Sequence, residues 1–181
     1  MAAPRPDLHR YGQPVSTTSG WARLRRSIRG AVARLTGSSG APPPTRATLP
    51  DHRGAVRLEY APRRDGDADP GEIVWGWVPF EDDPTRGKDR PVLVIGRDGP
   101  NVLGLMLTSK DHSRDTALEA RRGRVWMDIG SGPWDSQRRP SEVRLDRVLR
   151  LPPAAFRREG AVVDRALFDR VAAALREAHG W

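Results

Sequence analysis

The chain has 181 residues, 37% of them hydrophobic, with 17 prolines and 18 glycines, so we expect one folded domain beside a part that buries little. The absence of cysteine excludes disulfides, a cysteine nucleophile and thiolate metal sites, and no stretch approaches the ~20 apolar residues of a membrane span. The net charge is +8: residues 1–70 hold 12 arginines against 6 acids, and residues 71–181 hold 19 basic against 17 acidic residues. A basic arm beside a nearly neutral domain favours a polyanionic partner, and the default location is the cytoplasm.

The first part of the chain, residues 1–68, is expected to be a disordered, basic, Pro/Gly-rich extension. Residues 1–20 and 37–54 are rich in Pro, Gly, Ser and Thr and show no apolar periodicity. Between them, the apolar residues of segment 21–35 fall at helical spacing among five arginines, which predicts a basic amphipathic helix. A helix of this length frays alone in water, so we expect it to form on contact with a partner. A membrane-surface helix is the weaker alternative.

From residue 69 the pattern predicts a mainly β domain with a terminal helix. Strands are predicted, in chain order, over residues 71–78, 91–96, 102–108, 124–129 and 141–148, with residues 55–60 as a candidate edge strand. Helices are predicted over residues 151–160 and over residues 165–178, the second capped by Asp164 and ended by Gly180. Short consecutive strands followed by a helix indicate an α+β fold, namely a small antiparallel barrel or curled sheet with helices on one side.

One predicted hairpin brings together residues that could act on a phosphate. A Pro/Gly-containing loop carrying Arg86 and Lys88 leads through Arg90 into the apolar run 91–96, and the run 102–108 ends at Thr108. If the two runs pair antiparallel, Arg90 and Thr108 lie side by side at one end of the sheet. A guanidinium beside a hydroxyl can bind a phosphodiester and stabilise the added charge of its transition state. From spacing alone, the favoured interpretation is that Arg90 and Thr108 are ordinary residues at the rim of a sheet rather than a phosphate site.

Little else in the domain could carry catalysis. Of the four histidines, His9 and His52 lie in the extension and His179 stands at the extreme C-terminus, so His112 alone is left as material for a histidine acid–base pair or a histidine metal site. The acidic run Glu81, Asp82 and Asp83 reads as a solvated loop rather than a divalent-metal site. We therefore expect neither a metal nor a cofactor.

The domain resembles a known family over about residues 70–181. The resemblance rests on four runs: Gly71–Val74, Arg90–Ile95, Leu107–Thr108, and Pro140–Val148 before the C-terminal helix. These runs resemble the MazF/PemK toxins of type II toxin–antitoxin systems, which implies a MazF/PemK-like toxin domain over residues 69–181. The resemblance also implies a small SH3-like antiparallel barrel, a homodimer and a cognate, acidic antitoxin.

The resemblance further implies an activity: metal-independent, ribosome-independent cleavage of single-stranded mRNA that leaves a 2′,3′-cyclic phosphate. The family's catalytic Arg and Thr fall on Arg90 and Thr108. The candidate RNA-binding residues beside them are basic or polar: Arg86, Lys88, Ser109, Lys110 and His112. For Arg86, Lys88, Lys110 and His112, an ordinary solvent-exposed position without a role in binding is an equally good interpretation. The alternative function is a non-catalytic module on the same fold that binds nucleic acid or a partner protein, since the fold alone does not settle function.

Overall fold

The computed structural model describes residues 49–112 and 116–181. The expected disorder of residues 1–20, most of segment 37–54, and the expected helix 21–35 therefore lie outside the described residues. The elements, in chain order, are β1 (Glu72–Pro79), β2 (Gly87–Asp98), β3 (Asn101–Thr108), α1 (Thr116–Arg121), β4 (Trp126–Gly130), β5 (Ser141–Arg144), β6 (Leu149–Leu151), the 3-10 turn η2 (Pro153–Ala155), β7 (Phe156–Val162) and α2 (Arg165–His179).

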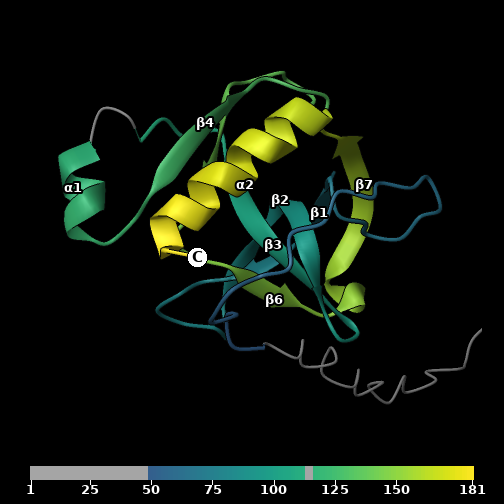
Figure 1. Ribbon diagram of the computed structural model, residues 1–181, viewed down its shortest axis with the longest axis horizontal. Helices are drawn as coiled ribbons and strands as arrows, with labels where there is room; N and C mark the ends of the chain where they lie inside the picture. The colour runs from purple at the N-terminus through teal and green to yellow at the C-terminus, as the bar shows by residue number, and fades with distance from the viewer. Residues whose placement is uncertain (1–48, 113–115) are drawn as a thin grey trace, which may run out of the picture. The chain divides into compact units, whose positions relative to one another are not determined.

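The strands form one curled antiparallel sheet with the helix α2 across one face (Figure 1). The strand order is β4-β5-β3-β2-β1-β7, and β6 pairs with the other end of β3. The prediction of a mainly β fold with a C-terminal helix is confirmed. Within the described residues, β4 and β7 are the two ends of this path and do not pair with each other, so hydrogen bonds do not close the sheet into a full barrel.

Alternation along the strands divides the core between the two faces of the sheet. Leu93 of β2 and Leu105 of β3 point to the face that α2 covers, where they join the largest hydrophobic cluster. Val92 and Met106 point to the opposite face and belong to a smaller cluster. Helix α2 contributes a buried stripe to the first face: Leu167, Phe168, Val171, Ala172 and Leu175. Its predicted cap is confirmed, because the Asp164 side chain accepts a hydrogen bond from the Leu167 backbone N–H at 2.6 Å.

The predicted hairpin of β2 and β3 is present. Its register pairs Val92 with Met106 and Val94 with Gly104, and a bulge follows before Gly96. Gly104 has no room for a side chain, because a Cβ atom there would collide with the Val92 methyl group. The ladder between the two strands ends at Val92 and Met106, and Arg90 and Thr108 each lie two residues beyond it, at the open end of the hairpin.

The predicted helix over residues 151–160 is wrong. After the short turn η2, the chain becomes strand β7, which pairs with β1 from Glu72↔Val162 to Gly76↔Phe156. The strand lies so close to β1 that a Cβ atom on Gly160 would be 2.6 Å from the carbonyl oxygen of Ile73. Pairing with an otherwise free strand edge therefore overrides the local helix signal. The short helix α1, by contrast, was not expected.

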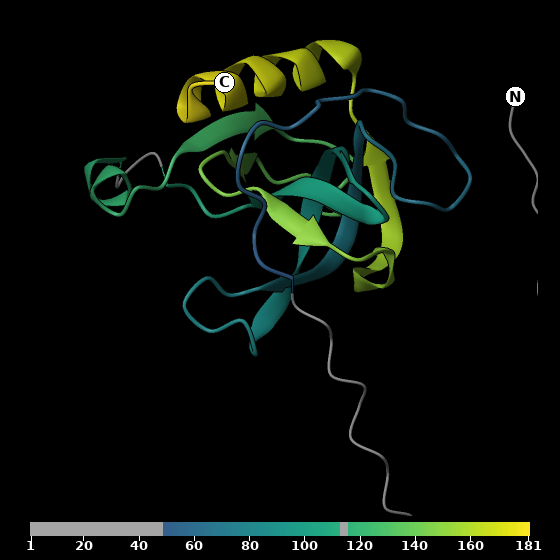
Figure 2. The same ribbon diagram turned by 60° about the horizontal axis from the view of Figure 1, so that its bottom comes forward.

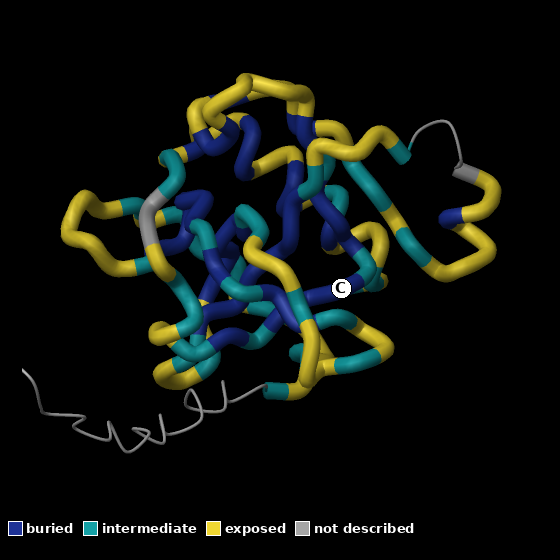
Figure 3. Tube along the Cα trace, turned by 180° about the vertical axis from the view of Figure 1, so that it is seen from behind, coloured by how far each residue is buried: buried dark blue, intermediate teal, exposed yellow. Residues whose placement is uncertain are grey.

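Residues that pack on the sheet are described from residue 49 onward, ahead of residue 69, where the folded domain is expected to begin. Residues 49–61, which we call the strap, run in extended form along the sheet without the strand expected over residues 55–60 (Figure 2). Three strap side chains are partly buried against the core: Val56, Leu58 and Tyr60. Figure 3 shows the strap as alternating exposed and intermediate segments beside the buried strands. None of the helices in the described ranges is long and apolar enough to cross a membrane.

Candidate RNA-cleavage site

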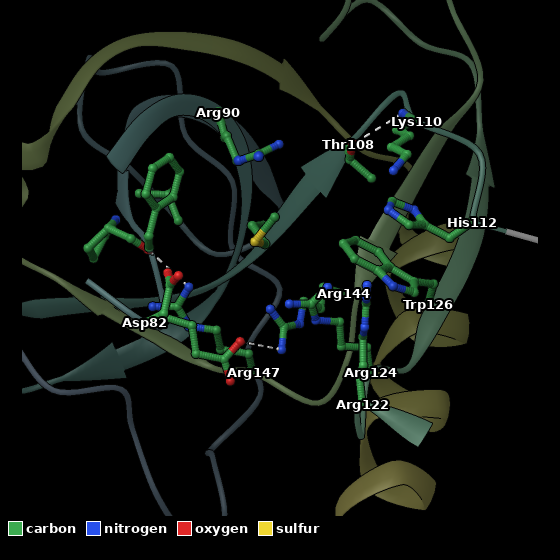
Figure 4. A pocket seen from close by; sticks show the side chains of 15 residues that line it. Asp82, Arg90, Thr108, Lys110, His112, Arg122, Arg124, Trp126, Arg144 and Arg147 are labelled. Atoms are coloured by element: carbon green, nitrogen blue, oxygen red, sulfur yellow. Dashed lines mark hydrogen bonds and ion pairs between the residues drawn. The ribbon is translucent and has the colours of Figure 1, made fainter. Parts of the chain in front are cut away.

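A groove of about 550 Å³ lies where the open ends of β2 and β3 meet the start of the β1–β2 loop and strand β5 (Figure 4). Six cationic side chains line it: Arg90, Lys110, Arg122, Arg124, Arg144 and Arg147. The acidic side chains on its wall are Glu81 and Asp82. The groove is therefore suited to an anionic ligand.

Arg90 and Thr108 stand together at one end of this groove, as the hairpin geometry predicted. In Figure 4 the Arg90 guanidinium extends toward Thr108. The Arg90 side chain is half-buried and, among the described residues, makes no hydrogen bond or ion pair, and burial lowers the pKa of its guanidinium. The Thr108 hydroxyl oxygen accepts a hydrogen bond from the Lys110 backbone N–H at 3.1 Å, which leaves the hydroxyl hydrogen to donate elsewhere. The pair can thus offer three or more N–H and O–H donors to one phosphate.

His112 forms part of the groove wall but is held by other groups. Its backbone N–H and its ring Nδ1 both lie within hydrogen-bonding distance of the Glu142 carboxylate, the ring at 2.7 Å. The ring stacks in parallel on Trp126 with 4.1 Å between centroids, and its side chain is only 12% exposed. Trp126 in turn donates its indole N–H to Glu119 at 3.0 Å, which lowers the pKa of that carboxyl group. His112 is thus a structural part of the wall, with little of its ring open to RNA.

Arg144 and Arg147 line the groove although the sequence analysis did not select them. Arg144 donates to Asp146 at 2.6 Å and to Glu81 at 2.9 Å. Burial acts to lower the pKa of Arg144, but these hydrogen bonds raise it above the ordinary value. A signal for Arg144 was present: Val143 and Leu145 of the predicted strand are apolar, so alternation places Arg144 on the opposite face. No comparable local signal exists for Arg147.

The other residues selected from the sequence surround the groove. Lys110 lines it, whereas Arg86, Lys88 and Ser109 are exposed and do not. The cationic groups of Arg86 and Lys88 lie 5.7 and 6.0 Å from the ring centroid of Phe80, which is itself part of the groove wall. Arg86 and Lys88 therefore lie behind the Phe80 wall, within reach of a bound polymer that extends beyond the groove.

Three carboxylates near the groove are already engaged. Glu81 pairs with Arg144, Glu142 holds His112, and Asp83 accepts a hydrogen bond from the Thr85 hydroxyl, which lowers the Asp83 pKa. Within residues 49–112 and 116–181, no group of three or more His, Asp or Glu side chains is placed to hold a metal ion.

A comparison with protein-family models places this chain in a family. No curated protein matches the chain. A solved structure described as "Endoribonuclease in complex with its cognate antitoxin from Mycobacterial species" is 16% identical, over 61% of this chain and 93% of that one, with a TM-score of 0.44. The Mycobacterium tuberculosis toxin MazF-mt6 is 20% identical, over 59% of this chain and 94% of that one, with a TM-score of 0.40. The family model described as "PemK-like, MazF-like toxin of type II toxin-antitoxin system" matches residues 69–179, more than half of the chain. The chain therefore belongs to the PemK-like, MazF-like toxins of type II toxin–antitoxin systems.

Proposed function

We propose that this toxin is an endoribonuclease that cuts single-stranded mRNA in the groove, without a metal ion and without the ribosome. The observation that carries the proposal is the half-buried Arg90 guanidinium, unpaired among the described residues, which extends toward the Thr108 hydroxyl. A half-buried cation without a partner carries a desolvation cost in a protein that only needs to fold, and it is useful where an anion must bind. Membership of the toxin family supports the same conclusion.

The reaction is a transesterification at phosphorus. The ribose 2′-oxygen attacks the adjacent phosphate, the bond to the 5′-oxygen breaks, and the products are a 2′,3′-cyclic phosphate and a 5′-hydroxyl. Arg90 binds a non-bridging oxygen and stabilises the added negative charge, while Thr108 donates a hydrogen bond to the same phosphate. Because burial lowers the pKa of Arg90, the guanidinium is also a better proton donor to the leaving 5′-oxygen than an exposed arginine. The proton of the 2′-hydroxyl leaves to solvent.

The remaining selected residues hold the substrate on either side of the cleaved bond. Lys110 and Ser109 follow Thr108 and bind the backbone on one side, and Arg86 and Lys88 bind it beyond the Phe80 wall. His112 supports the wall on which a flanking base rests. Each backbone contact releases counterions, so binding weakens as the salt concentration rises.

Two protein partners complete the proposal. The cationic groove suits an acidic segment of a cognate antitoxin, and antitoxin binding there would exclude RNA. One solved relative is described as an endoribonuclease in complex with its cognate antitoxin. The toxin acts as a homodimer in the cytoplasm, where its mRNA substrate is found.

The experiment is a cleavage assay with purified protein, a 5′-labelled single-stranded RNA and excess EDTA. Discrete fragments that end in a 2′,3′-cyclic phosphate are expected, and replacing the 2′-hydroxyl at the cleaved nucleotide by hydrogen should protect that bond. Binding without fragments would contradict the proposal and would support the alternative of a non-catalytic module that binds nucleic acid or a partner protein. Fragments that appear only when a divalent metal is added would contradict the proposed chemistry.

A further inference from the structure

The strap, residues 49–61, precedes the family-matched region 69–179 and is nevertheless built into the fold. Its backbone N–H groups donate to core strands and turns, from His52 to the Val148 carbonyl at 2.9 Å and from Glu59 to the Ile95 carbonyl at 3.1 Å. Where it crosses β2, a Cβ atom on Gly96 would be 2.6 Å from the carbonyl oxygen of Arg57. Contacts this close at several points hold the strap in a single position on the sheet.

The N-terminal end of the strap contacts a residue of the groove. The Asp51 carboxylate accepts two hydrogen bonds from the Arg147 guanidinium, at 2.6 Å from Nε and 3.2 Å from Nη2. The third nitrogen, Nη1, donates to the carbonyl oxygen of Pro79 at 3.0 Å. Pro79 ends β1 and begins the wall formed by residues 79–82. Arg147 therefore ties the strap to the wall, and Figure 4 shows it on the side of the groove opposite Thr108.

Asp51 supplies the negative charge that Arg147 needs. The Arg147 side chain is 8% exposed, so its charge is shielded from water. Glu81 on the groove wall is also an ion-paired carboxylate, but its partner is Arg144. A buried guanidinium that loses its carboxylate is left with an uncompensated charge, and the other anionic groups on the groove that Arg147 lines are Asp82, Glu81 and the substrate phosphate.

We propose that Asp51 is a positioning residue for RNA cleavage: it holds Arg147 against the Pro79 carbonyl and so keeps this guanidinium from competing with Arg90 for the scissile phosphate. The inference rests on the proposed function. It assigns a role in catalysis to a segment that precedes the family-matched region. The strap thus belongs to the working enzyme, and the toxin needs a longer chain than the family match delimits.

Removing Asp51 should separate RNA binding from RNA cleavage. With Asp51→Ala the groove gains one net positive charge, so affinity for RNA stays the same or increases. Cleavage slows for two reasons: the freed guanidinium draws the phosphate away from Arg90, and the wall at Pro79 loses its hydrogen-bonded connection to the strap. Misplacements on the order of 1 Å can cost roughly 10²-fold in rate. A loss of folded protein would lower both quantities together. The combination of slower turnover with undiminished affinity is therefore specific to positioning.

The test uses the full-length protein with five variants: Asp51→Ala, Asp51→Asn, Asp51→Glu, Arg147→Ala and the double variant Asp51→Ala/Arg147→Ala. Single-turnover cleavage gives the rate constant, a fully 2′-O-methylated RNA of the same sequence gives the affinity, and thermal unfolding gives the folded fraction. The matched control is Glu59→Ala, which removes another ion-paired carboxylate from the strap, one that pairs with the exposed Arg57.

We expect Asp51→Ala and Asp51→Asn to lower the cleavage rate constant roughly tenfold or more without weaker binding of the 2′-O-methylated RNA. Asp51→Glu should recover most of the rate, Glu59→Ala should match the parent, and the double variant should be no slower than Arg147→Ala alone, because the two residues act as one unit. The inference is overturned if Asp51→Ala cleaves at the parental rate, loses rate only in proportion to its folded fraction, or adds its effect fully to that of Arg147→Ala. A parent protein that does not cleave at all would instead overturn the proposed function.

Discussion

Replacing Arg90 by alanine should remove most of the cleavage activity and leave the stability of the domain unchanged. Within the described residues the Arg90 side chain has no ion pair or hydrogen bond, so its removal leaves no carboxylate without a partner, and it relieves the desolvation that lowers the pKa of the guanidinium. We therefore expect a change in the free energy of unfolding within about 0.5 kcal/mol. The loss of a donor aimed at the transition state costs on the order of 10²–10³ in rate, equivalent to roughly 2.7–4 kcal/mol.

Arg144→Ala in the same groove is the matched comparison, because the structure predicts the opposite balance. The Arg144 side chain is 6% exposed and donates to Asp146 and Glu81. Each hydrogen bond to a charged group contributes about 1.5–3 kcal/mol, and the exposed Glu81 regains water when the bond is lost, so we expect a net destabilisation of about 2 kcal/mol. That difference corresponds to a melting temperature lower by roughly 4–8 °C.

The assay measures single-turnover cleavage of a labelled RNA in EDTA, together with thermal unfolding of the same preparations. The reasoning is supported if Arg90→Ala melts with the parent but fails to cleave, while Arg144→Ala melts several degrees lower. It is refuted if Arg90→Ala cleaves at the parental rate. It is also refuted if Arg90→Ala melts as far below the parent as Arg144→Ala does, since the guanidinium would then have a structural role.

Three further predictions concern other parts of the chain. Deleting residues 1–48, which hold eight arginines and one aspartate, should leave the melting temperature unchanged and make RNA affinity less dependent on salt; an unchanged salt slope would show that this arm does not touch RNA. Gly96→Val should free the strap, because its Cβ would meet the Arg57 carbonyl, and limited proteolysis should then cut within residues 49–61 faster than in the parent. Trp126→Phe removes the hydrogen bond that contributes most to the lowered pKa of Glu119. A carboxyl group whose pKa is lowered in the folded state stabilises the protein above the ordinary glutamate pKa of about 4.3, and this stabilisation is lost as the pH falls through the folded-state pKa. The difference in melting temperature between parent and Trp126→Phe should therefore be larger at neutral pH than in acid. An equal difference at both pH values would contradict this.

Much of the sheet could be predicted because its signals are local. The β2–β3 hairpin follows from two apolar runs around a turn-forming connector, and helix α2 follows from its cap and apolar stripe. The same hairpin accounts for the neighbouring positions of Arg90 and Thr108. Strand β7 could not be predicted in this way, because its conformation depends on pairing with β1, which lies more than seventy residues earlier in the chain.

The strap and the far wall of the groove depend on contacts between distant residues. The strap has the composition of a linker, and its order comes from spaces left by Gly71 and Gly96, where the Tyr60 ring and the Arg57 carbonyl fit. The pair of Asp51 and Arg147 joins positions 96 residues apart. Neither partner stands in a local pattern that marks it, so this part of the site becomes visible only in three dimensions.

The groove draws its residues from two kinds of backbone, and this division allows rate and sequence preference to change independently. Arg90 and Thr108 stand on strands whose ladders hold them, with Arg90 paired to Gly76 and Thr108 to Glu142. Phe80, Glu81 and Asp82, in contrast, line the groove from the β1–β2 loop, which tolerates substitutions and insertions that a ladder does not. If the groove cleaves RNA as proposed, exchanging that loop for one of different composition alters which RNA sequences are bound, while the geometry at the cut phosphate stays the same.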